Sequence, residues 1–423
     1  MAKKVQPKIE RQYDIVLFGA TGFTGGLTAK YLAAHAPAGL RWAIAGRSET
    51  KLASVRRSLA AIDSKWADLP LIVVDATDAE TLGEVAASTK VICTTVGPYL
   101  QHGEPLVAAC AAKGTDYVDL TGEPEFVDTM YVKYHDLAKR NGARIVHACG
   151  FDSIPHDLGA WWTVQQLDSA KPIKLRGVVR TGAGFSGGTY HSALDQLARS
   201  GQMRQAMQAR REHEQRPKGR KVRAVQGKPS RDSLLGYYLL PLPTIDPFIV
   251  VRSAAALDVY GPEFTYSHFA GLKTLTYTLG GVAAVVSLGV AAKIPPARSF
   301  LKSRVKQGTG PSVQKRERSW FTVDFIGEQG GQILHTQGQW RRSWLHRDLE
   351  DVGRVGHVSG SRRQPACGRI GDYGRGHGSQ SSSPAGAGRN QIRSHLRPAP
   401  PSGEQRLADV LTLLHARRHC KQS

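Results

Sequence analysis

Residues that could hold a dinucleotide are concentrated at the start of the chain. Tyr13–Gly26 reads YDIVLFGATGFTGG, an apolar run that ends in glycines spaced three residues apart and is followed at once by a helical pattern. A helix N-terminus offers unpaired N–H groups and the positive end of its dipole, and glycines let the backbone approach phosphates closely. The stretch therefore predicts a pyrophosphate cradle, with GxxGxxG spacing instead of the commoner GxGxxG. The predicted cofactor contacts here are Gly19, Ala20, Thr21, Gly22, Phe23, Thr24 and Gly25.

The end of the next apolar run indicates which dinucleotide is bound. NAD-preferring sites place an acidic residue there for the ribose 2′-hydroxyl, whereas an arginine accommodates a 2′-phosphate. In this chain Arg47 and Ser48 follow the run, and no nearby acid precedes Glu49. Arginine stacks on adenine and pairs with phosphate, so the sequence predicts NADP(H).

Two further strand ends complete the predicted cofactor site. Asp75 ends the third strand, where it is placed to touch adenine or to cap the following helix. Val96, Gly97 and Pro98 end the fourth strand and are expected near the nicotinamide.

The elements that must position these residues alternate between strand-like and helical patterns. Six strands alternating with helices predict a Rossmann-type doubly wound parallel sheet of the α/β class over residues 13–160, after a flexible 1–12. A second α+β substrate domain is expected over 161–335. Its expected strands are 173–180, 247–252, 263–268 and 320–326. The glycine loop 182–188 reads equally as a mobile lid or as a turn before a helix at 190–198.

Several motifs, in this order and spacing, carry a family resemblance. They are GATGFTG, AGRS, TTVGPY, YVDLTGE, CGFDSIPHD, GFSGG and GTGPS, and the resemblance runs from Tyr13 to His335. The chain resembles the saccharopine dehydrogenase-like oxidoreductases, and within them the mycobacterial trans-acting enoyl reductases of complex lipid synthesis. The resemblance implies NADPH-dependent reduction of a carbon–carbon double bond in a polyketide or lipid acyl intermediate of the phthiocerol type, tethered to a carrier.

That reaction needs a donor for the thioester carbonyl oxygen and a proton for the α-carbon. Tyr99 and His156 are the candidate catalytic residues, and no motif fixes the acid. The polar residues around them, on or just after the fourth and sixth strands, are His102, His147, Asp152 and Ser153. Asp152 and Ser153 also read as caps of the following helix, with Pro155 in its first turn. We expect no metal site.

The basic composition does not indicate nucleic-acid binding. Of a net charge of +22, residues 336–423 carry +9 and residues 204–231 carry +8, which leaves +5 over the rest of the chain. The segment 204–231 has no aromatic residue that could stack on bases. It reads as a solvated insertion, or as a docking site for an acidic carrier protein or an anionic lipid surface.

One apolar stretch raises the question of a membrane. Residues 275–292 are uncharged and lie between Lys273 and Lys293. This length suffices to consider a membrane span. A buried helix lining an acyl pocket is the favoured interpretation, with a membrane-apposed helix as the alternative. The following 296–306 is basic and partly amphipathic, which suits contact with anionic lipid.

The composition changes after about His335. The last 88 residues contain one Lys and 14 Arg, with 12 Gly, and show no sustained helix or strand period before 407–414. Residues 339–351 can be encoded by a DNA sequence that, read in a shifted frame, gives the peptide SGGDPGYTETSK. Residues 362–377 can be encoded in the same way by a sequence whose shifted frame gives DDNPPVAGSVTTAVAM. Both peptides resemble the family's continuation, so we predict a frameshift near Thr336 and a disordered, out-of-frame tail. Sequencing the codons for His335 to Gln339 tests this, and a clean single frame with relatives sharing the tail would contradict it.

Three functional classes remain from the sequence. The favoured one is a cytoplasmic NADPH-dependent enoyl reductase, with a homodimer as one assembly to test. The alternatives are a membrane- or lipid-associated dinucleotide-fold protein without turnover, and a saccharopine or amino-acid dehydrogenase. The last needs cations for substrate carboxylates, for which Arg180 and Arg252 are candidates. No apolar signal stretch opens the chain, and five cysteines favour reduced thiols over a disulfide scaffold.

Overall fold

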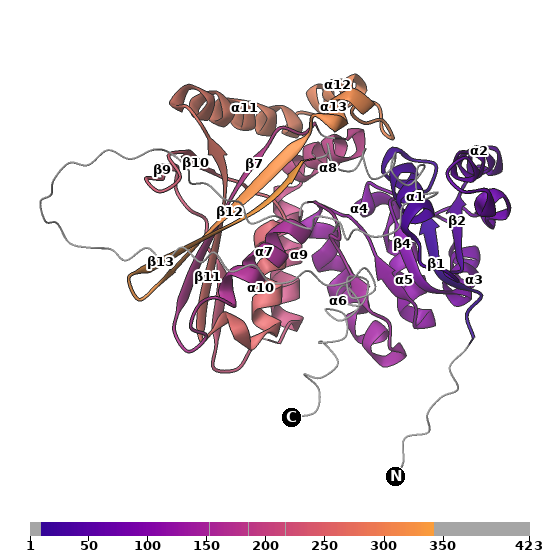
Figure 1. The fold of residues 1–423 in the computed structure, drawn as a ribbon, viewed down its shortest axis with the longest axis horizontal. Helices are drawn as coiled ribbons and strands as arrows, with labels where there is room; N and C mark the ends of the chain where they lie inside the picture. Colours follow the sequence, from indigo (N-terminus) through magenta and orange to yellow (C-terminus); the bar gives the residue numbers. More distant parts are fainter. Residues whose placement is uncertain (1–9, 152, 185, 216, 342–423) are drawn as a thin grey trace, which may run out of the picture. The chain divides into compact units, whose positions relative to one another are not determined.

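The computed structural model describes residues 10–151, 153–184, 186–215 and 217–341 (Figure 1). The chain forms two compact units. The described part of the first is 10–151, 186–214 and 287–311, and the rest belongs to the second. The units thus interleave in sequence instead of meeting at a single boundary near residue 160, because two later segments return to the first unit.

The first unit contains a parallel sheet, as predicted. Among the described residues its strands follow the order β3-β2-β1-β4-β5-β6, and each neighbouring pair is parallel. The strands are β1 (Tyr13–Phe18), β2 (Trp42–Gly46), β3 (Leu71–Val73), β4 (Thr89–Thr94), β5 (Asp116–Val118) and β6 (Ile145–Val146). Chain order reverses between β1 and β4, which is the switch point where doubly wound sheets bind ligands.

Helices follow the strands and bury both faces of this sheet. They are α1 (Phe23–His35), α2 (Glu49–Ala60), α3 (Ala79–Ser88), α4 (Tyr99–His102), α5 (Glu104–Lys113) and α6 (Pro124–Asn141), with a 3₁₀ turn η1 (Ser64–Asp68). Alternate residues of β1 enter two different cores: Val16 and Phe18 pack into one, and Leu17 packs into the other. A strand buried on both faces explains the continuous apolar run seen in the sequence.

The returning segments add α8 (Gly187–Ala198), α9 (Ser200–His213) and α12 (Pro295–Arg304) to the first unit. α9 packs on α6, and the buried Arg210 donates to Asp128 at 2.6 Å and to Glu214 at 2.8 Å. The first part of the basic segment 204–231 is therefore a packed helix and not a solvated insertion. Its later part pairs into the second sheet as β8 (Lys221–Ala224) and β9 (Ser230–Arg231).

The expected flexible N-terminus is anchored where it is described. The guanidinium of Arg11 donates to the carbonyls of Ala86, Ala87 and Lys113 at 2.6–2.8 Å. Residues 1–9 lie outside the described residues.

The second unit is built on a mixed sheet, as predicted. Its described order is β13-β12-β7-β11-β10-β9, with β8 beside β11. β7 and β11 pair in parallel, whereas β12 is antiparallel to both β7 and β13. The strands not yet bounded are β7 (Ile173–Thr181), β10 (Tyr238–Pro241), β11 (Glu263–Leu272), β12 (Trp320–Gln329) and β13 (Gln332–Arg341). The remaining helical elements of this unit are α7 (Ile154–Val164), α10 (Asp246–Ala256), η2 (Asp258–Tyr260) and α13 (Val313–Glu317).

The predicted strand at 247–252 is wrong, because this stretch belongs to helix α10. Pro247 stands in its first turn, where proline favours a helix, and the buried Val250 and Ala254 lie four residues apart. The apolar run had a helical period that its short length concealed.

The prediction that 275–292 is a buried helix is half right. α11 (Leu275–Lys293) is a helix, but only 11% of its most apolar 18-residue window is buried. The change of composition near Thr336 does not coincide with the end of the described fold, because β13 pairs with β12 as far as Arg341. The predicted out-of-frame tail beyond that point, 342–423, lies outside the described residues.

Candidate active site

The cradle for the pyrophosphate is formed where β1 ends and α1 begins. Gly22 caps α1, with no side-chain cap and no acidic residue in the first turn of the helix. Gly19 has φ +87°, and a Cβ there would lie 2.6 Å from Val96 Cγ2. A Cβ on Gly25 would lie 2.1 Å from the Gly19 carbonyl oxygen. Both positions therefore exclude side chains, and the helix N-terminus is left open to an anion, which fits a dinucleotide phosphate.

Two distant motifs also reach this cradle within the first unit. Gly310, in the GTGPS motif, packs so closely on Phe23 that a Cβ would lie 2.3 Å from its ring. Thr309, beside it, accepts a hydrogen bond at 2.9 Å from the N–H of Gly187, in the GFSGG motif. The predicted glycine loop thus starts α8 at Gly187, which favours the interpretation as a turn before a helix.

The residues predicted to contact the adenosine lie at the carboxyl edge of β2 and β3. Arg47 follows β2 and is exposed, and Ser48 caps α2 by accepting from the Lys51 N–H at 3.4 Å. Asp75 accepts from the N–H and hydroxyl of Thr77 at 2.9 and 2.7 Å. These bonds, with a smaller contribution from the charge of Arg47, lower the pKa of Asp75. Arg47 and Asp75 therefore face a common region, and the carboxylate is ionised there.

The residues predicted to lie near the nicotinamide follow β4. Val96 is half-buried against Gly19, and the Gly97–Pro98 peptide is cis. The turn is held by Glu123, which was not among the predicted site residues. Its carboxylate is buried and accepts from the N–H groups of Tyr99 at 3.1 Å and Leu100 at 2.9 Å. Only the YVDLTGE motif pointed to this residue, without showing that it caps α4.

Beside this turn the first unit has a pocket of about 370 Å³ with three cations in its lining. It is lined by Pro98, Leu100, Gln101, Glu123, Asp195, Arg199, Arg298 and Lys302. Lys302 is paired with Asp195 at 2.6 Å, and Arg199 is paired with Glu125 at 2.6 Å. Within the described part of the chain, the guanidinium of Arg298 has no hydrogen bond or ion pair. The pocket therefore presents an uncommitted positive charge next to the predicted nicotinamide position.

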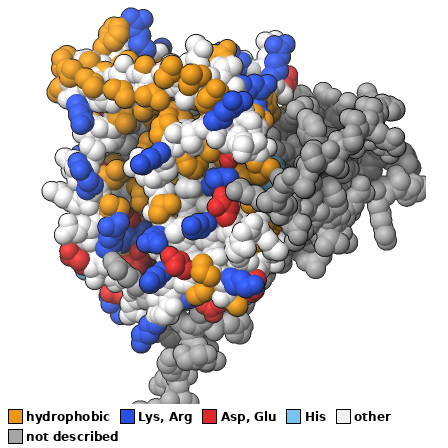
Figure 2. All heavy atoms as spheres, turned by 90° about the vertical axis from the view of Figure 1, so that its left-hand side faces the viewer, with side chains coloured by type: hydrophobic (Ala, Val, Ile, Leu, Met, Phe, Trp, Pro, Cys, Tyr) orange, Lys and Arg blue, Asp and Glu red, His pale blue; other side chains and the backbone are white. Residues whose placement is uncertain are grey.

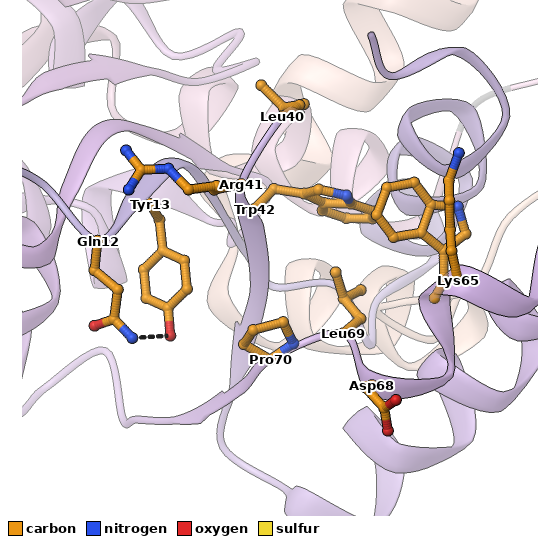
Figure 3. A pocket seen from close by; sticks show the side chains of 10 residues that line it. Gln12, Tyr13, Leu40, Arg41, Trp42, Lys65, Asp68, Leu69 and Pro70 are labelled. Carbon is orange, nitrogen blue, oxygen red and sulfur yellow. Dashed lines mark hydrogen bonds between the residues drawn. The ribbon is translucent and has the colours of Figure 1, made fainter. Parts of the chain in front are cut away.

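A second hollow, of about 340 Å³, lies at the opposite edge of the sheet (Figure 3). Tyr13, Trp42 and Pro70 line it, close to the amino ends of β1, β2 and β3 (Figure 3). Ligands of open α/β sheets bind outside the carboxyl ends of the strands. The pocket beside Pro98, and not this hollow, is therefore the candidate active site.

Tyr99, a predicted catalytic residue, is 5% exposed and lies inside the first unit. Its hydroxyl donates to the Thr94 carbonyl at 3.2 Å and accepts from the Leu120 N–H at 3.4 Å. Burial raises the pKa of the phenol well above its usual value. These contacts suit a residue that fixes the β4 turn, not one that gives a proton to substrate.

His156, the other predicted catalytic residue, is 1% exposed and lies in the second unit. Its Nδ1 is 2.8 Å from Asp246, which also lies 3.6 Å from Nε2 of His268. The three side chains offer ligand atoms within 4.8 Å of one another, and the shortest separation is a hydrogen-bond distance. Burial lowers the pKa of His268 to about 4, so this histidine is neutral beside the Asp246 carboxylate. We interpret the group as a buried polar core of the second unit.

His147, another of the polar candidates, is also an internal support. The His147 ring is buried and bonds Asp119 at 2.6 Å, and Asp119 also accepts from the Ala148 N–H at 2.9 Å. This pair fixes the turn after β6, where Ala148 has φ +59°. His102 is half-buried on α4, and Asp152 lies outside the described residues.

Comparison with known proteins decides the family. The model of the saccharopine dehydrogenase NADP-binding domain matches residues 15–146. The "Putative trans-acting enoyl reductase Rv2449c" of Mycobacterium tuberculosis is 39% identical over 341 residues, which cover 74% of this chain and 80% of that protein. The chain belongs to the saccharopine dehydrogenase-like oxidoreductase family. A "Trans-acting enoyl reductase" of Mycobacterium ulcerans is 36% identical, with 74% and 81% covered.

Among solved structures, this family member is similar to the apo form of yeast saccharopine dehydrogenase (L-Glu forming). The TM-score is 0.43 and the identity 12%, with 82% of this chain and 92% of that one covered. The protein is an NADP-dependent oxidoreductase, and its cofactor is NADP(H). The cradle on α1 agrees with this cofactor, because it leaves backbone N–H groups and no acidic side chain facing the phosphate position.

Proposed function

We propose that this oxidoreductase reduces the carbon–carbon double bond of an α,β-unsaturated acyl thioester, a lipid or polyketide intermediate bound to a carrier. Two relatives that are 39% and 36% identical to this chain over the aligned residues bear the name trans-acting enoyl reductase, and this observation carries the proposal. Synthesis of phthiocerol-type lipids is the proposed setting, in the cytoplasm or at a membrane. NADPH, when bound, supplies the hydride.

The reaction defines what the chain must provide. One hydride adds to the β-carbon, the electron pair of the double bond moves toward the carbonyl, and one proton from solvent or the protein adds to the α-carbon. In our proposal the cradle at Gly19–Gly25 and the cis turn at Pro98 hold the cofactor, and the pocket beside Pro98 receives the thioester. Tyr99 and His156 support the two units internally and are not assigned to proton transfer.

The pocket suggests how a carrier-bound substrate is held. A phosphopantetheine arm brings one phosphate between the carrier and the thioester, and arginine is well suited to bind it. Arg298 is the cation available for this role, because Arg199 and Lys302 are already paired. Exposed cations of α9 in the same unit, such as Arg204 and Arg211, would face an acidic carrier.

The test is turnover of the purified full-length chain with NADPH and a panel of enoyl thioesters. We expect loss of absorbance at the nicotinamide band together with a product two hydrogens heavier by mass spectrometry. Gly25→Val is the control that removes cofactor binding, since even a Cβ meets the Gly19 carbonyl oxygen at 2.1 Å. Oxidation of NADPH by keto acids with an amine, and by no enoyl thioester, would contradict the proposal.

Arg298 is tested by comparing two substrates with the same acyl group. The wild type should show a lower KM for the phosphopantetheine thioester than for the pantetheine thioester, and Arg298→Gln should abolish that difference. Arg304→Gln, on the same helix but not in the pocket, is the matched control. Equal KM values for both thioesters in the wild type would remove Arg298 from the proposal.

The amino-acid dehydrogenase alternative has weaker support. Arg180, one of its two candidate cations, already donates to the Tyr237 hydroxyl and stacks between Tyr237 and Trp320. A dinucleotide-fold protein without turnover would bind NADPH and leave every acyl substrate unchanged in the assay above.

A further inference from the structure

α11 exposes an apolar surface that the proposed reaction does not use. The helix contains no charged residue before Lys293, yet most of its large side chains face solvent. The exposed fractions are Leu275 51%, Tyr277 71%, Leu279 62%, Val282 36%, Val285 49%, Val286 60% and Val290 58%. Figure 2 shows hydrophobic side chains gathered along the upper edge of this face, where Figure 1 places α11. Water does not favour such a surface, so it indicates a binding partner.

The helix touches the folded protein along one narrow stripe. Thr278 and Ala292 are buried, and Gly281 lies against the second sheet. A Cβ on Gly281 would lie 3.8 Å from Leu240 Cδ2 and 4.0 Å from Leu272 Cδ1. Because α11 packs on the second sheet at Gly281, crossing a bilayer would carry that sheet into the hydrocarbon, although the 19 residues of the helix would be long enough to span it. The geometry therefore suits a helix lying along a membrane surface.

The charges around α11 are of one sign. From Phe264 to Arg316 the chain has eight Lys and Arg residues and no Asp or Glu. Lys273 and Lys293, at the two ends of the helix, are exposed. Apolar side chains bordered only by cations match the acyl region and headgroups of an anionic bilayer.

We propose that α11 is a monotopic membrane-binding element that lies in the interface of an anionic lipid bilayer, with Lys273 and Lys293 at its two ends on the headgroups. A second copy of the chain is a poorer occupant. A two-fold contact of α11 with itself would place the same all-cationic border opposite its own image, which repels. The inference rests on the exposed helix and not on the enoyl reductase assignment.

The test is flotation of the full-length protein with vesicles of phosphatidylcholine containing 30% phosphatidylglycerol. We expect co-flotation at low salt, less at 0.5 M NaCl, and little with pure phosphatidylcholine. Val286→Asp should reduce the bound fraction at least tenfold. The matched control is Val73→Asp on β3, whose valine is 51% exposed in the first unit and should change binding little.

A second measurement separates lipid binding from misfolding and from self-association. NADPH binding should be the same for wild type and Val286→Asp, because α11 contributes nothing to the cradle. Failure of the full-length chain to float on anionic vesicles would overturn the proposal. So would a lipid-free dimer, seen by light scattering, that Val286→Asp converts to a monomer, because α11 would then be a protein interface.

Discussion

Arg47 should set the preference of this enzyme for NADPH over NADH, and Arg47→Ala measures its contribution. A hydrogen bond to a charged group contributes about 1.5–3 kcal/mol when its partner is not replaced. Arg47 is exposed at the end of β2, so solvent screening places its bond to a 2′-phosphate at the low end of that range. With about 1.4 kcal/mol for each factor of ten, the Kd for NADPH should rise roughly 10- to 30-fold. The Kd for NADH should stay the same, because NADH lacks that phosphate.

Two titrations of each variant, one with NADPH and one with NADH, followed by nicotinamide fluorescence, give the two Kd values. Arg41→Ala is the matched control, because Arg41 is also an exposed arginine but precedes β2 at the opposite edge of the sheet, where it pairs with Asp14 at 3.5 Å. That variant should bind both cofactors as the wild type does. If Arg47→Ala weakens NADH as much as NADPH, or weakens neither, the assignment of Arg47 to the 2′-phosphate is refuted.

Three further substitutions test the internal supports of the two units. Glu123→Ala leaves the N–H groups of Tyr99 and Leu100 and the hydroxyl of Ser192 without their acceptor, at roughly 1 kcal/mol each, so urea unfolding should show a loss of about 3 kcal/mol. Glu263→Ala, which breaks an exposed pair with Arg223, should cost under about 1 kcal/mol, and equal losses for the two variants would contradict the role of Glu123. Arg210→Met should cost about 3–5 kcal/mol by removing one side of the buried Arg210–Asp128 ion pair, whereas Arg211→Met should be nearly neutral in the same unfolding assay. His268 has its pKa lowered from 6.5 to about 4, so the unfolded chain binds the proton more readily and stability should fall as pH drops from 6.5 to 4. His268→Gln should flatten that part of the profile of melting temperature against pH, and an unchanged slope would show that another group titrates there. A chelator should leave the melting temperature unchanged if the trio is held by hydrogen bonds, and a lower value would point to a metal.

The cofactor half of the fold was readable from the sequence because its signals are local. Three signals depend on contacts within a few residues: the glycine triplet, the Gly46-Arg47-Ser48 turn and the apolar run of β1. A strand buried on both faces is recognised from its continuous apolar run alone. Prediction failed where tertiary packing decides. The run at 247–252 had strand-like composition, but α10 forms because Val250 and Ala254 have a core to face.

The catalytic candidates show a different limit of sequence reasoning. Tyr99 and His156 follow strands of the predicted sheet, which placed them near substrate by topology alone. Sequence position gives no sign that the Tyr99 hydroxyl points inward to Thr94, or that His156 meets Asp246 and His268 from elsewhere in the second unit. Arg298 was overlooked for the converse reason. It lies in a basic stretch that resembles a surface helix, and only the return of α12 to the first unit brings it beside Pro98.

The interleaved chain explains why the family motifs are so widely spaced. Gly310 lies 287 residues after Phe23, yet no side chain fits between that glycine and the Phe23 ring. Gly187 is excluded from bearing a side chain in the same way, because a Cβ there would lie 2.1 Å from the Lys306 carbonyl oxygen. Gly310 therefore lets one returning segment pack on the cofactor cradle, and Gly187 lets the other returning segment pack on the first. The segment that contains Gly310 also contains α12 and the end of α11, so the chain that closes the cradle is continuous with the proposed membrane-binding helix. One continuous stretch, from Leu275 to Pro311, would thus both bind the membrane and close the cofactor cradle.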